Sequence, residues 1–374
     1  MKFTRKAIAG ISALALMTGL AACGGSSRGT DAASGGTEAS ANASDTLIGI
    51  SMPTKSLERW NKDGANLESQ LEKLGYKVSL QYADNKPNQQ VDQIQNMAND
   101  GAKVVIVGSI DGTAVGPAVE AAKSNGATII AYDRLIMNTD AVDYYATFDL
   151  AEVGKLQGQY IADALGLEDG ATGPFNIELM TGSPDDNNAR YFFEGAWSIL
   201  GPYFESGVLQ SPSGKVPSSV DDWQSIGILS WDQKKAQDEM ENRLNSFYTG
   251  DTKLDAVLAP NDALALGTVN AIEAKGWDYM PVITGQDCDK ANVANIVAGK
   301  QSMDVFKDTR KLADAVATMT DQIVKGETVE TDSSYNNGTK DVPTKLLTPI
   351  TITKDNVQEE LVDTGYISAE DAGL

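Results

Sequence analysis

Short apolar runs alternate with amphipathic helical patterns along most of the chain after residue 45, and this alternation constrains the fold more than any other feature. The runs at 47–52, 104–107 and 128–132 are largely apolar, which is typical of strands buried on both faces of a parallel sheet. Between such runs, apolar residues recur at helical spacing, as in 60–74. We therefore expect an α/β fold in which helices cover both faces of a parallel sheet.

The number of these units predicts two sheets rather than one. Further strands are expected at 175–180, 226–229, 256–258, 282–284 and 303–306, with helical patterns between most of them. A single sheet of ordinary size does not hold so many strands, and 374 residues is a typical length for two domains. The predicted fold class is two doubly wound parallel-sheet lobes.

The composition excludes several classes of function. The chain contains no histidine, which rules out histidine-based triads and histidine metal ligands. With 30 Lys+Arg against 52 Asp+Glu, the formal net charge is −22, and an acidic surface repels the phosphates of nucleic acids. The sequence also lacks the glycine-rich phosphate loops and the EF-hand calcium loop. We expect no cofactor, no bound metal and no nucleic-acid partner.

The first 45 residues are expected to export and tether the protein rather than to fold. A basic start at 2–6 precedes an apolar run at 7–20, which is too short for a permanent spanning helix and fits a signal peptide at 1–22. The run ends in Leu20-Ala21-Ala22-Cys23, which resembles a bacterial lipobox and implies a lipid on Cys23. The alternative is a plain secretory signal with an incidental cysteine. Residues 23–45 are rich in Gly, Ser, Ala and Thr and are predicted to form a flexible tether.

Polar residues follow the expected strands, where ligands bind in doubly wound sheets. Asp133-Arg134 comes directly after the strand at 128–132. A carboxylate beside a guanidinium can grip vicinal hydroxyls of a sugar while each group holds the other in place. Trp60 and Trp231 can each offer a flat surface to a sugar ring. Because these residues lie far apart in the chain, they can meet only if two lobes face each other across a cleft.

Each polar or aromatic candidate also has an ordinary structural explanation, and both explanations stay open at this stage. Trp60 and Trp231 can simply be core or hinge residues, and Asp133-Arg134 can be a surface ion pair. The acid- and amide-rich segment 183–188 can cap the following helix, a role we assign mainly to Asp185. Asp186 and Asn188 are the better candidates for ligand contact. The further candidates, with capping or solvation as their alternatives, are Asn261, Asp287 and Lys307.

Several motifs, in order along nearly the whole mature chain, together resemble one family. They include Met52-Pro53-Thr54-Lys55-Ser56 with Arg59-Trp60, Ala131-Tyr132-Asp133-Arg134, Ser183-Pro184-Asp185-Asp186-Asn187-Asn188, Gly285-Gln286-Asp287 and Phe306-Lys307-Asp308. This set resembles the monosaccharide-binding lipoproteins and periplasmic proteins that supply ABC importers. The nearest types are the multiple sugar-binding receptors and the D-xylose-binding proteins.

The resemblance implies a periplasmic binding protein of type I, with two lobes joined by three crossovers. The N-terminal lobe would comprise 46–148 plus 308–346, and the C-terminal lobe 149–307 plus 347–374. The protein would be no enzyme, would act as a monomer, and would be anchored to the membrane through Cys23. The implied sugar contacts are Arg59, Trp60, Asp133, Arg134, Asp186, Asn188, Trp231, Asn261, Asp287 and Lys307, with Lys55 a weaker candidate.

The expected function is capture of a monosaccharide by hinge closure, followed by delivery to the permease and ATPase of an ABC transporter. Xylose, glucose, galactose and fructose all offer suitable hydroxyls. One alternative is a receptor of the same fold that reports a sugar or an autoinducer to a membrane kinase. Another is a glycosidase that uses Asp186 and Asp287 as its carboxylate pair. A sugar-responsive repressor is excluded, because an export signal stands where a DNA-binding helix-turn-helix would be.

Overall fold

The computed structural model describes residues 43–374. The expected signal peptide, nearly all of the tether and Cys23 lie outside the described residues. Within 43–374, no helix is both long and apolar enough to cross a membrane.

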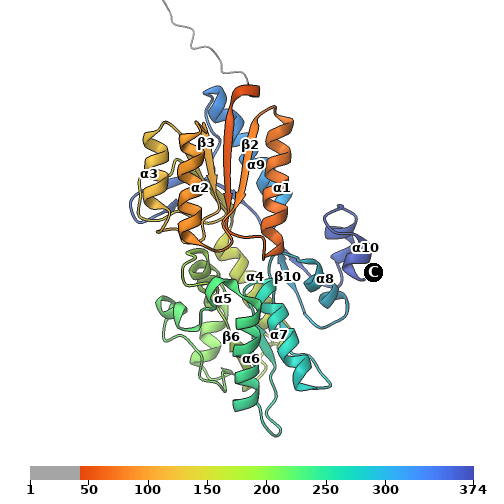
Figure 1. Cartoon of the computed structure of the whole chain (residues 1–374). Coiled ribbons are helices and arrows are strands. Elements are labelled where there is room, and N and C mark those ends of the chain that lie inside the picture. The colour runs from red at the N-terminus through yellow and green to blue at the C-terminus, as the bar shows by residue number, and fades with distance from the viewer. Residues whose placement is uncertain (1–42) are drawn as a thin grey trace, which may run out of the picture. The chain divides into compact units, whose positions relative to one another are not determined.

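The larger sheet has seven strands in the order β11-β12-β5-β4-β3-β1-β2 (Figure 1). All neighbouring strands are parallel except β11 and β12. The strands are β1 (Leu47–Met52), β2 (Lys77–Tyr82), β3 (Val104–Val107), β4 (Thr128–Tyr132), β5 (Tyr144–Phe148), β11 (Ser333–Asn336) and β12 (Asp341–Leu347). Every residue of β3 is buried, as expected for a strand covered on both faces.

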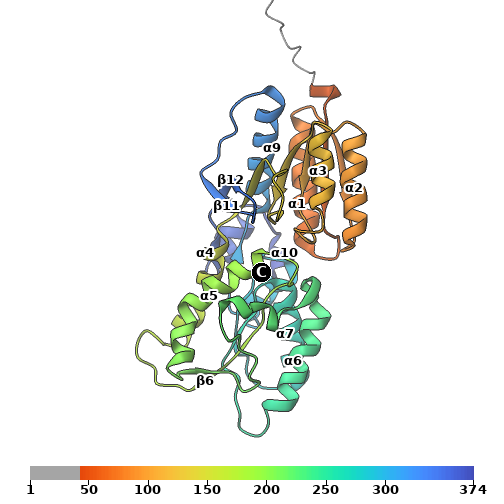
Figure 2. The ribbon, with the colours of Figure 1, turned by 90° about the vertical axis from the view of Figure 1, so that its left-hand side faces the viewer.

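Helices cover both faces of this sheet. One face packs against α1 (Glu58–Lys73) and α9 (Thr309–Lys325), and the other packs against α2 (Pro87–Asn99) and α3 (Gly116–Ser124). Figures 1 and 2 show the four helices around the sheet. α9 lies far from the others in the sequence, so this lobe is built from two separate segments of the chain.

The second lobe contains a four-stranded parallel sheet in the order β7-β6-β8-β9. Its strands are β6 (Phe175–Leu179), β7 (Leu209–Gln210), β8 (Ala256–Leu258) and β9 (Val282–Ile283). Its helices are α4 (Leu150–Ala164), α5 (Asn188–Glu205), α6 (Gln233–Phe247), α7 (Asp262–Lys275) and α8 (Lys290–Val297). The short helix α10 (Ala369–Ala372) packs on α8 near the end of the chain.

The chain passes between the lobes three times: from β5 to α4, from β10 (Asp304–Phe306) to α9, and from β12 to β13 (Ile350–Ile352). β10 and β13 pair with each other as an antiparallel ribbon. The helix after each of the first two passages begins at an aspartate whose carboxylate caps it. Asp149 accepts from the Glu152 N–H at 3.1 Å, and Asp308 accepts from the Arg310 N–H at 3.0 Å. The two-lobed fold class is confirmed, while the exact lobe boundaries stay a prediction.

Helices α4 and α5 cross at very short range through two glycines. A Cβ at Gly154 would lie 1.8 Å from the Phe192 carbonyl oxygen, and one at Gly195 would lie 2.1 Å from the Ala151 carbonyl oxygen. Neither position can hold a side chain without moving a backbone. This crossing sets the position of α5, whose first two turns carry Asn188 and Phe192.

One expected element is wrong. The sequence predicts a strand at 226–229, but the structure has 3₁₀ turns at Val220–Ile226 and Leu229–Trp231, with a single β-bridge between Thr181 and Gly227. The backbone at Ser230 and Trp231 has positive φ angles of 64° and 52°, which a strand does not allow. This turn directs Trp231 toward Asp186, as described next.

Candidate functional site

Residues from both lobes line a small cavity with about 20 Å³ of free volume, which we call the interlobe cavity. Its lining residues are Leu57, Arg59, Trp60, Asp133, Arg134, Asp186, Asn188, Phe192, Trp231, Asn261, Gln286, Asp287 and Lys307. They come from the ends of strands or the starts of helices in both lobes. The strand-end rule thus places most of the predicted residues around one space.

Arg59, near the start of α1, is the central cation of the cavity. Its guanidinium donates to Asp63 at 2.9 Å, to Asp133 at 3.0 Å and to Asp287 at 3.2 Å. Lys307, at the second passage between the lobes, lies 3.1 Å from Asp287 and 3.8 Å from Asp133. Asp133 belongs to one lobe and Asp287 to the other, so these two cations bridge the lobes.

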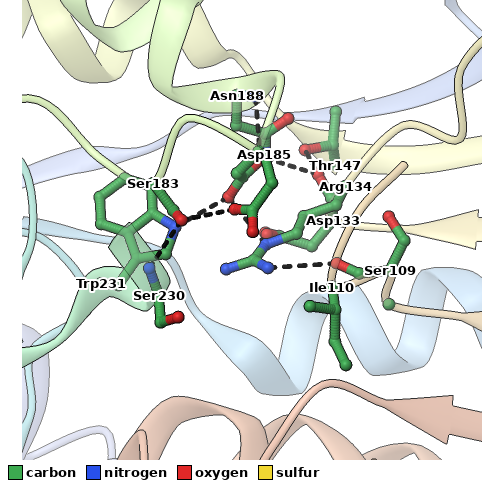
Figure 3. A network of polar contacts seen from close by, with 12 residues as sticks. Ser109, Ile110, Asp133, Arg134, Thr147, Ser183, Asp185, Asn188, Ser230 and Trp231 are labelled. Carbon is green, nitrogen blue, oxygen red and sulfur yellow. Dashed lines mark hydrogen bonds and ion pairs between the residues drawn. The ribbon is translucent and has the colours of Figure 1, made fainter. Parts of the chain in front are cut away.

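Arg134 pairs with Asp186 of the other lobe rather than with its sequence neighbour. Its Nε lies 2.8 Å from Asp186 Oδ2, and one Nη donates to the Ser109 carbonyl at 3.1 Å (Figure 3). The same Asp186 oxygen accepts from the Trp231 indole N–H at 3.1 Å. The expectation that Asp133 and Arg134 hold each other in place is corrected here, because the closest ion pair of Asp133 is with Arg59 and that of Arg134 is with Asp186.

The backbone carbonyl of Asp133 is a second point of contact between the lobes. It accepts from the Tyr145 hydroxyl at 2.7 Å, the Thr147 hydroxyl at 3.0 Å and the Asn188 side-chain amide at 2.8 Å (Figure 3). Asp133 has a positive φ of 60°, and these three donors hold that left-handed conformation. Its side chain is thereby directed at the cations of the cavity.

The pKa values of two cavity carboxylates, Asp133 and Asp186, shift in opposite directions. Burial alone would raise the pKa of Asp133, but Arg59, Lys307 and Arg134 outweigh it and hold this pKa below its ordinary value. Burial dominates at Asp186 and raises its pKa in spite of Arg134. Asp133 therefore stays an ionised acceptor, which suits hydrogen bonds from hydroxyl groups.

Aromatic rings form part of the cavity wall. The guanidiniums of Arg59 and Arg134 lie 4.6 Å and 5.2 Å from the centre of the Trp60 ring. The buried Trp60 indole nitrogen has no hydrogen-bond partner within the described chain. Trp60 and Trp231 also belong to the hydrophobic cores of their lobes, so for both residues the core and the cavity explanations hold together.

Asn261 likewise combines two roles. Its side-chain oxygen caps α7 by accepting from the Leu264 N–H at 3.1 Å, and the residue lines the cavity. Asp185 does not cap α5 as expected, because its carboxylate accepts from the Ser183 hydroxyl and α5 has no side-chain cap.

Lys55 is the one predicted contact that the structure does not bring to the interlobe cavity. It is exposed, and its ammonium lies 4.9 Å from the centre of the Tyr82 ring. Three lining residues were missed: Leu57, Phe192 and Gln286. Phe192 follows Asn188 by four residues, so helical spacing on α5 could have indicated it.

Gly182 supports Trp231 in the cavity wall, and this leads to a prediction. A Cβ at Gly182 would lie 2.0 Å from the Trp231 ring, so Gly182→Val must displace the indole from Asp186. We expect about a tenfold or greater loss of affinity for the ligand that this cavity holds, measured by calorimetric titration. Gly116→Ala, whose added Cβ meets no atom within 4 Å, is the control and should bind normally. Equal affinity of the two variants would show that binding does not depend on the position of Trp231.

A doubly wound pair of lobes that encloses a polar cavity at the strand ends defines a periplasmic binding protein of type I. The chain belongs to the periplasmic binding protein family, whose domain matches residues 48–328.

Curated relatives support the same class. The chain is 46% identical to a multiple sugar-binding periplasmic protein of Azospirillum brasilense over 85% of this chain and 89% of that protein. It is 36% identical to the D-xylose-binding periplasmic protein of Escherichia coli K12, covering 88% and 93% of the two chains. These relatives are binding proteins rather than enzymes.

A solved structure is as similar to this chain in sequence as the first of these relatives. An ABC transporter solute-binding protein of Clostridium phytofermentans, determined with bound β-D-glucose, is 47% identical to the chain. The match has a TM-score of 0.84 and covers 87% of this chain and 100% of that one.

Proposed function

We propose that the protein is an extracytoplasmic solute-binding protein that captures one monosaccharide between its lobes. The observation that carries the proposal is the interlobe cavity, where carboxylate, guanidinium and amide groups from both lobes lie beside two tryptophans. These groups donate to and accept from sugar hydroxyls, and the rings offer a surface for sugar C–H groups. The groups lie against one another and leave about 20 Å³ of free volume, so a sugar ring enters only by replacing some of their mutual contacts.

Hinge closure is the proposed mechanism of capture. Open and closed states of such proteins are close in energy, and a sugar that touches both lobes favours the closed state. The ion pairs of Arg59 with Asp287 and of Arg134 with Asp186 join the lobes in the same way. When a sugar binds, its hydroxyls would replace part of these contacts. The charged groups would then have hydrogen-bond or ion-pair partners both with and without the sugar.

Delivery to the permease of an ABC transporter is the proposed next step. The relatives named as periplasmic sugar-binding proteins, and the similar solute-binding protein of an ABC transporter, support this step. The lipobox-like sequence ending at Cys23 supports a lipid anchor that keeps the receptor beside its permease. The preferred sugar is proposed to be an aldopentose or aldohexose such as xylose, glucose or galactose, with fructose as a further candidate.

A thermal-shift panel of monosaccharides tests the proposal. A ligand at about 100 times its Kd adds about 2.7 kcal/mol to the free energy of unfolding. At this chain length, that corresponds to a rise in Tm of about 3–4 °C. We expect such a rise with D-glucose or D-xylose and none with the disaccharide sucrose. If no monosaccharide in the panel raises Tm, the proposed function is wrong.

A further inference from the structure

Two buried aspartates lie against each other beneath the loop that carries Asp287. Asp262 is the first residue of α7 and Asp304 the first of β10, and their side chains are 1% and 0% exposed. The side-chain amide nitrogen of Gln301 lies 3.5 Å from Asp262 Oδ1 and 3.5 Å from Asp304 Oδ2, so the two carboxyl groups share one donor. Two buried carboxylates that share one amide repel each other, and a proton held by the pair removes that repulsion. Oδ1 of Asp304 is buried and has no hydrogen-bond partner within the described chain.

The loop above the pair, Gly285 to Asp289, is strained and firmly held. Asp287 and Cys288 have positive φ angles of 103° and 54°, which non-glycine residues keep only when neighbouring groups enforce them. Asp262 enforces them from one side: its N–H donates to the Gln286 carbonyl at 3.0 Å, and its Oδ2 accepts from the Asp289 N–H at 2.6 Å.

The strand that begins at Asp304 holds the same loop from the other side. The Val305 carbonyl accepts from the Asp287 N–H at 3.0 Å, and the Val305 N–H donates to the Gly285 carbonyl at 3.0 Å. The two carboxyl groups therefore belong to the two elements that frame the loop. A change in their separation moves the loop, and with it the Asp287 carboxylate that faces Arg59 and Lys307.

We propose that Asp262 and Asp304 are positioning residues of the sugar site: by sharing one proton they hold the Asp287 loop in its binding conformation, and loss of that proton weakens sugar binding. The inference deepens the proposed function and rests on it. Neither residue lines the interlobe cavity, so both act through Asp287.

The charges around the pair favour the shared proton. Burial, the largest cause, raises the pKa of both groups, and the charge of Asp287 raises both further. Asp289 raises the pKa of Asp304, whereas the hydrogen bond from its backbone N–H lowers that of Asp262. The groups that face this region are Asp287, Cys288 and Asp289 on the loop, Glu58 and Lys62 on α1, Lys307 after β10, and Tyr366 near the C-terminus.

The direction of the pH effect follows from this balance. Below the pKa of Asp304 the pair keeps its proton and the loop keeps its shape. As the pH rises above the raised pKa of the pair, a second negative charge forms in a buried site, and the two carboxylates repel each other. Sugar affinity is therefore expected to fall at alkaline pH. Asp304→Asn mimics the protonated form, because its amide can donate to Asp262 at any pH.

The experiment compares the Kd for D-glucose and for D-xylose of the wild-type chain and Asp304→Asn between pH 6.5 and 9.5. We expect the wild-type affinity to fall about tenfold or more across this range and the variant's to fall less than threefold. Asp262→Asn should flatten the profile in the same way. The exposed control Asp238→Asn, on α6, should follow the wild type. Parallel profiles for the wild type and both pair variants would overturn the inference.

A second measurement works without sugar. Cys288 is a free, fully buried cysteine in the loop, so its alkylation rate reports loop opening. Peptide mass spectrometry separates it from Cys23. At pH 9.5 we expect faster alkylation of Cys288 in the wild type than in Asp304→Asn, and equal rates would contradict the role of the pair. If neither sugar binds to any variant, the proposed function fails, and the alkylation rates alone decide whether the pair holds the loop.

Discussion

Replacing Asp133 with alanine is expected to lower sugar affinity about a hundredfold, equivalent to about 2.7 kcal/mol. The surrounding cations hold the pKa of the Asp133 carboxylate below its ordinary value, and the residue is 3% exposed. Its loss removes an ionised acceptor for sugar hydroxyls. It also leaves Arg59 and Lys307 with less buried negative charge between them. Calorimetric titration with the sugar that gives the largest thermal shift measures the effect.

A conservative variant separates binding from folding in this test. Alanine disfavours the positive φ of 60° at position 133, whereas asparagine tolerates it. We therefore expect Asp133→Asn to keep the Tm of the wild type more closely while still losing most of the affinity. Asp221→Ala, at an exposed ion pair with Arg190, is the control and should bind normally. Unchanged affinity in Asp133→Asn would reject Asp133 as a sugar contact.

Replacing Arg59 with methionine is expected to lower the free energy of unfolding by about 3–5 kcal/mol at neutral pH. The guanidinium is the shared partner of Asp63, Asp133 and Asp287, all of them buried. Methionine fills much of the same volume but leaves these carboxylates without that partner. Urea unfolding measures the loss, and an unfolding free energy within about 1 kcal/mol of the wild type would show that the cluster does not depend on Arg59.

The pH dependence of this loss has a defined sign. In the wild type the pKa of Asp133 is depressed, so its stabilising contribution is present above the ordinary aspartate pKa and is lost as the pH falls through the folded-state pKa. The difference between the wild type and Arg59→Met should therefore shrink toward acid pH, where the carboxyls are protonated. Arg190→Met, at an exposed ion pair, should change stability by less than about 1 kcal/mol at any pH.

The fold could be predicted from sequence wherever local pattern and burial agree. The apolar runs that form β1, β3 and β4 are buried because helices cover both faces of their sheet. A continuous apolar run indicates a strand in that environment. The strand predicted at 226–229 failed for the opposite reason. Ile226 and Ile228 are buried, but they flank only a single β-bridge at Gly227 between two 3₁₀ turns, and Leu229 is half exposed. Burial alone does not distinguish these two cases.

The sequence predicted which residues line the site, from their positions after strand ends, but not which of them form ion pairs with each other. The rule that ligands bind beyond strand ends led to ten of the residues that line the interlobe cavity. It did not reveal that Arg134 pairs with Asp186 and Asp133 with Arg59, since those partners lie in other segments of the chain. Lys55 met the same positional rule, yet its side chain lies outside, on Tyr82.

The amino-acid order by itself determined the two-lobed α/β class, the acidic character and the residue types available for a polyol, because periodicity and composition act locally along the chain. Only the tertiary structure decided which carboxylate meets which cation. Such pairings depend on how separate strand ends and helix starts converge, and on left-handed backbone at Asp133 and Asp287 that long-range hydrogen bonds enforce.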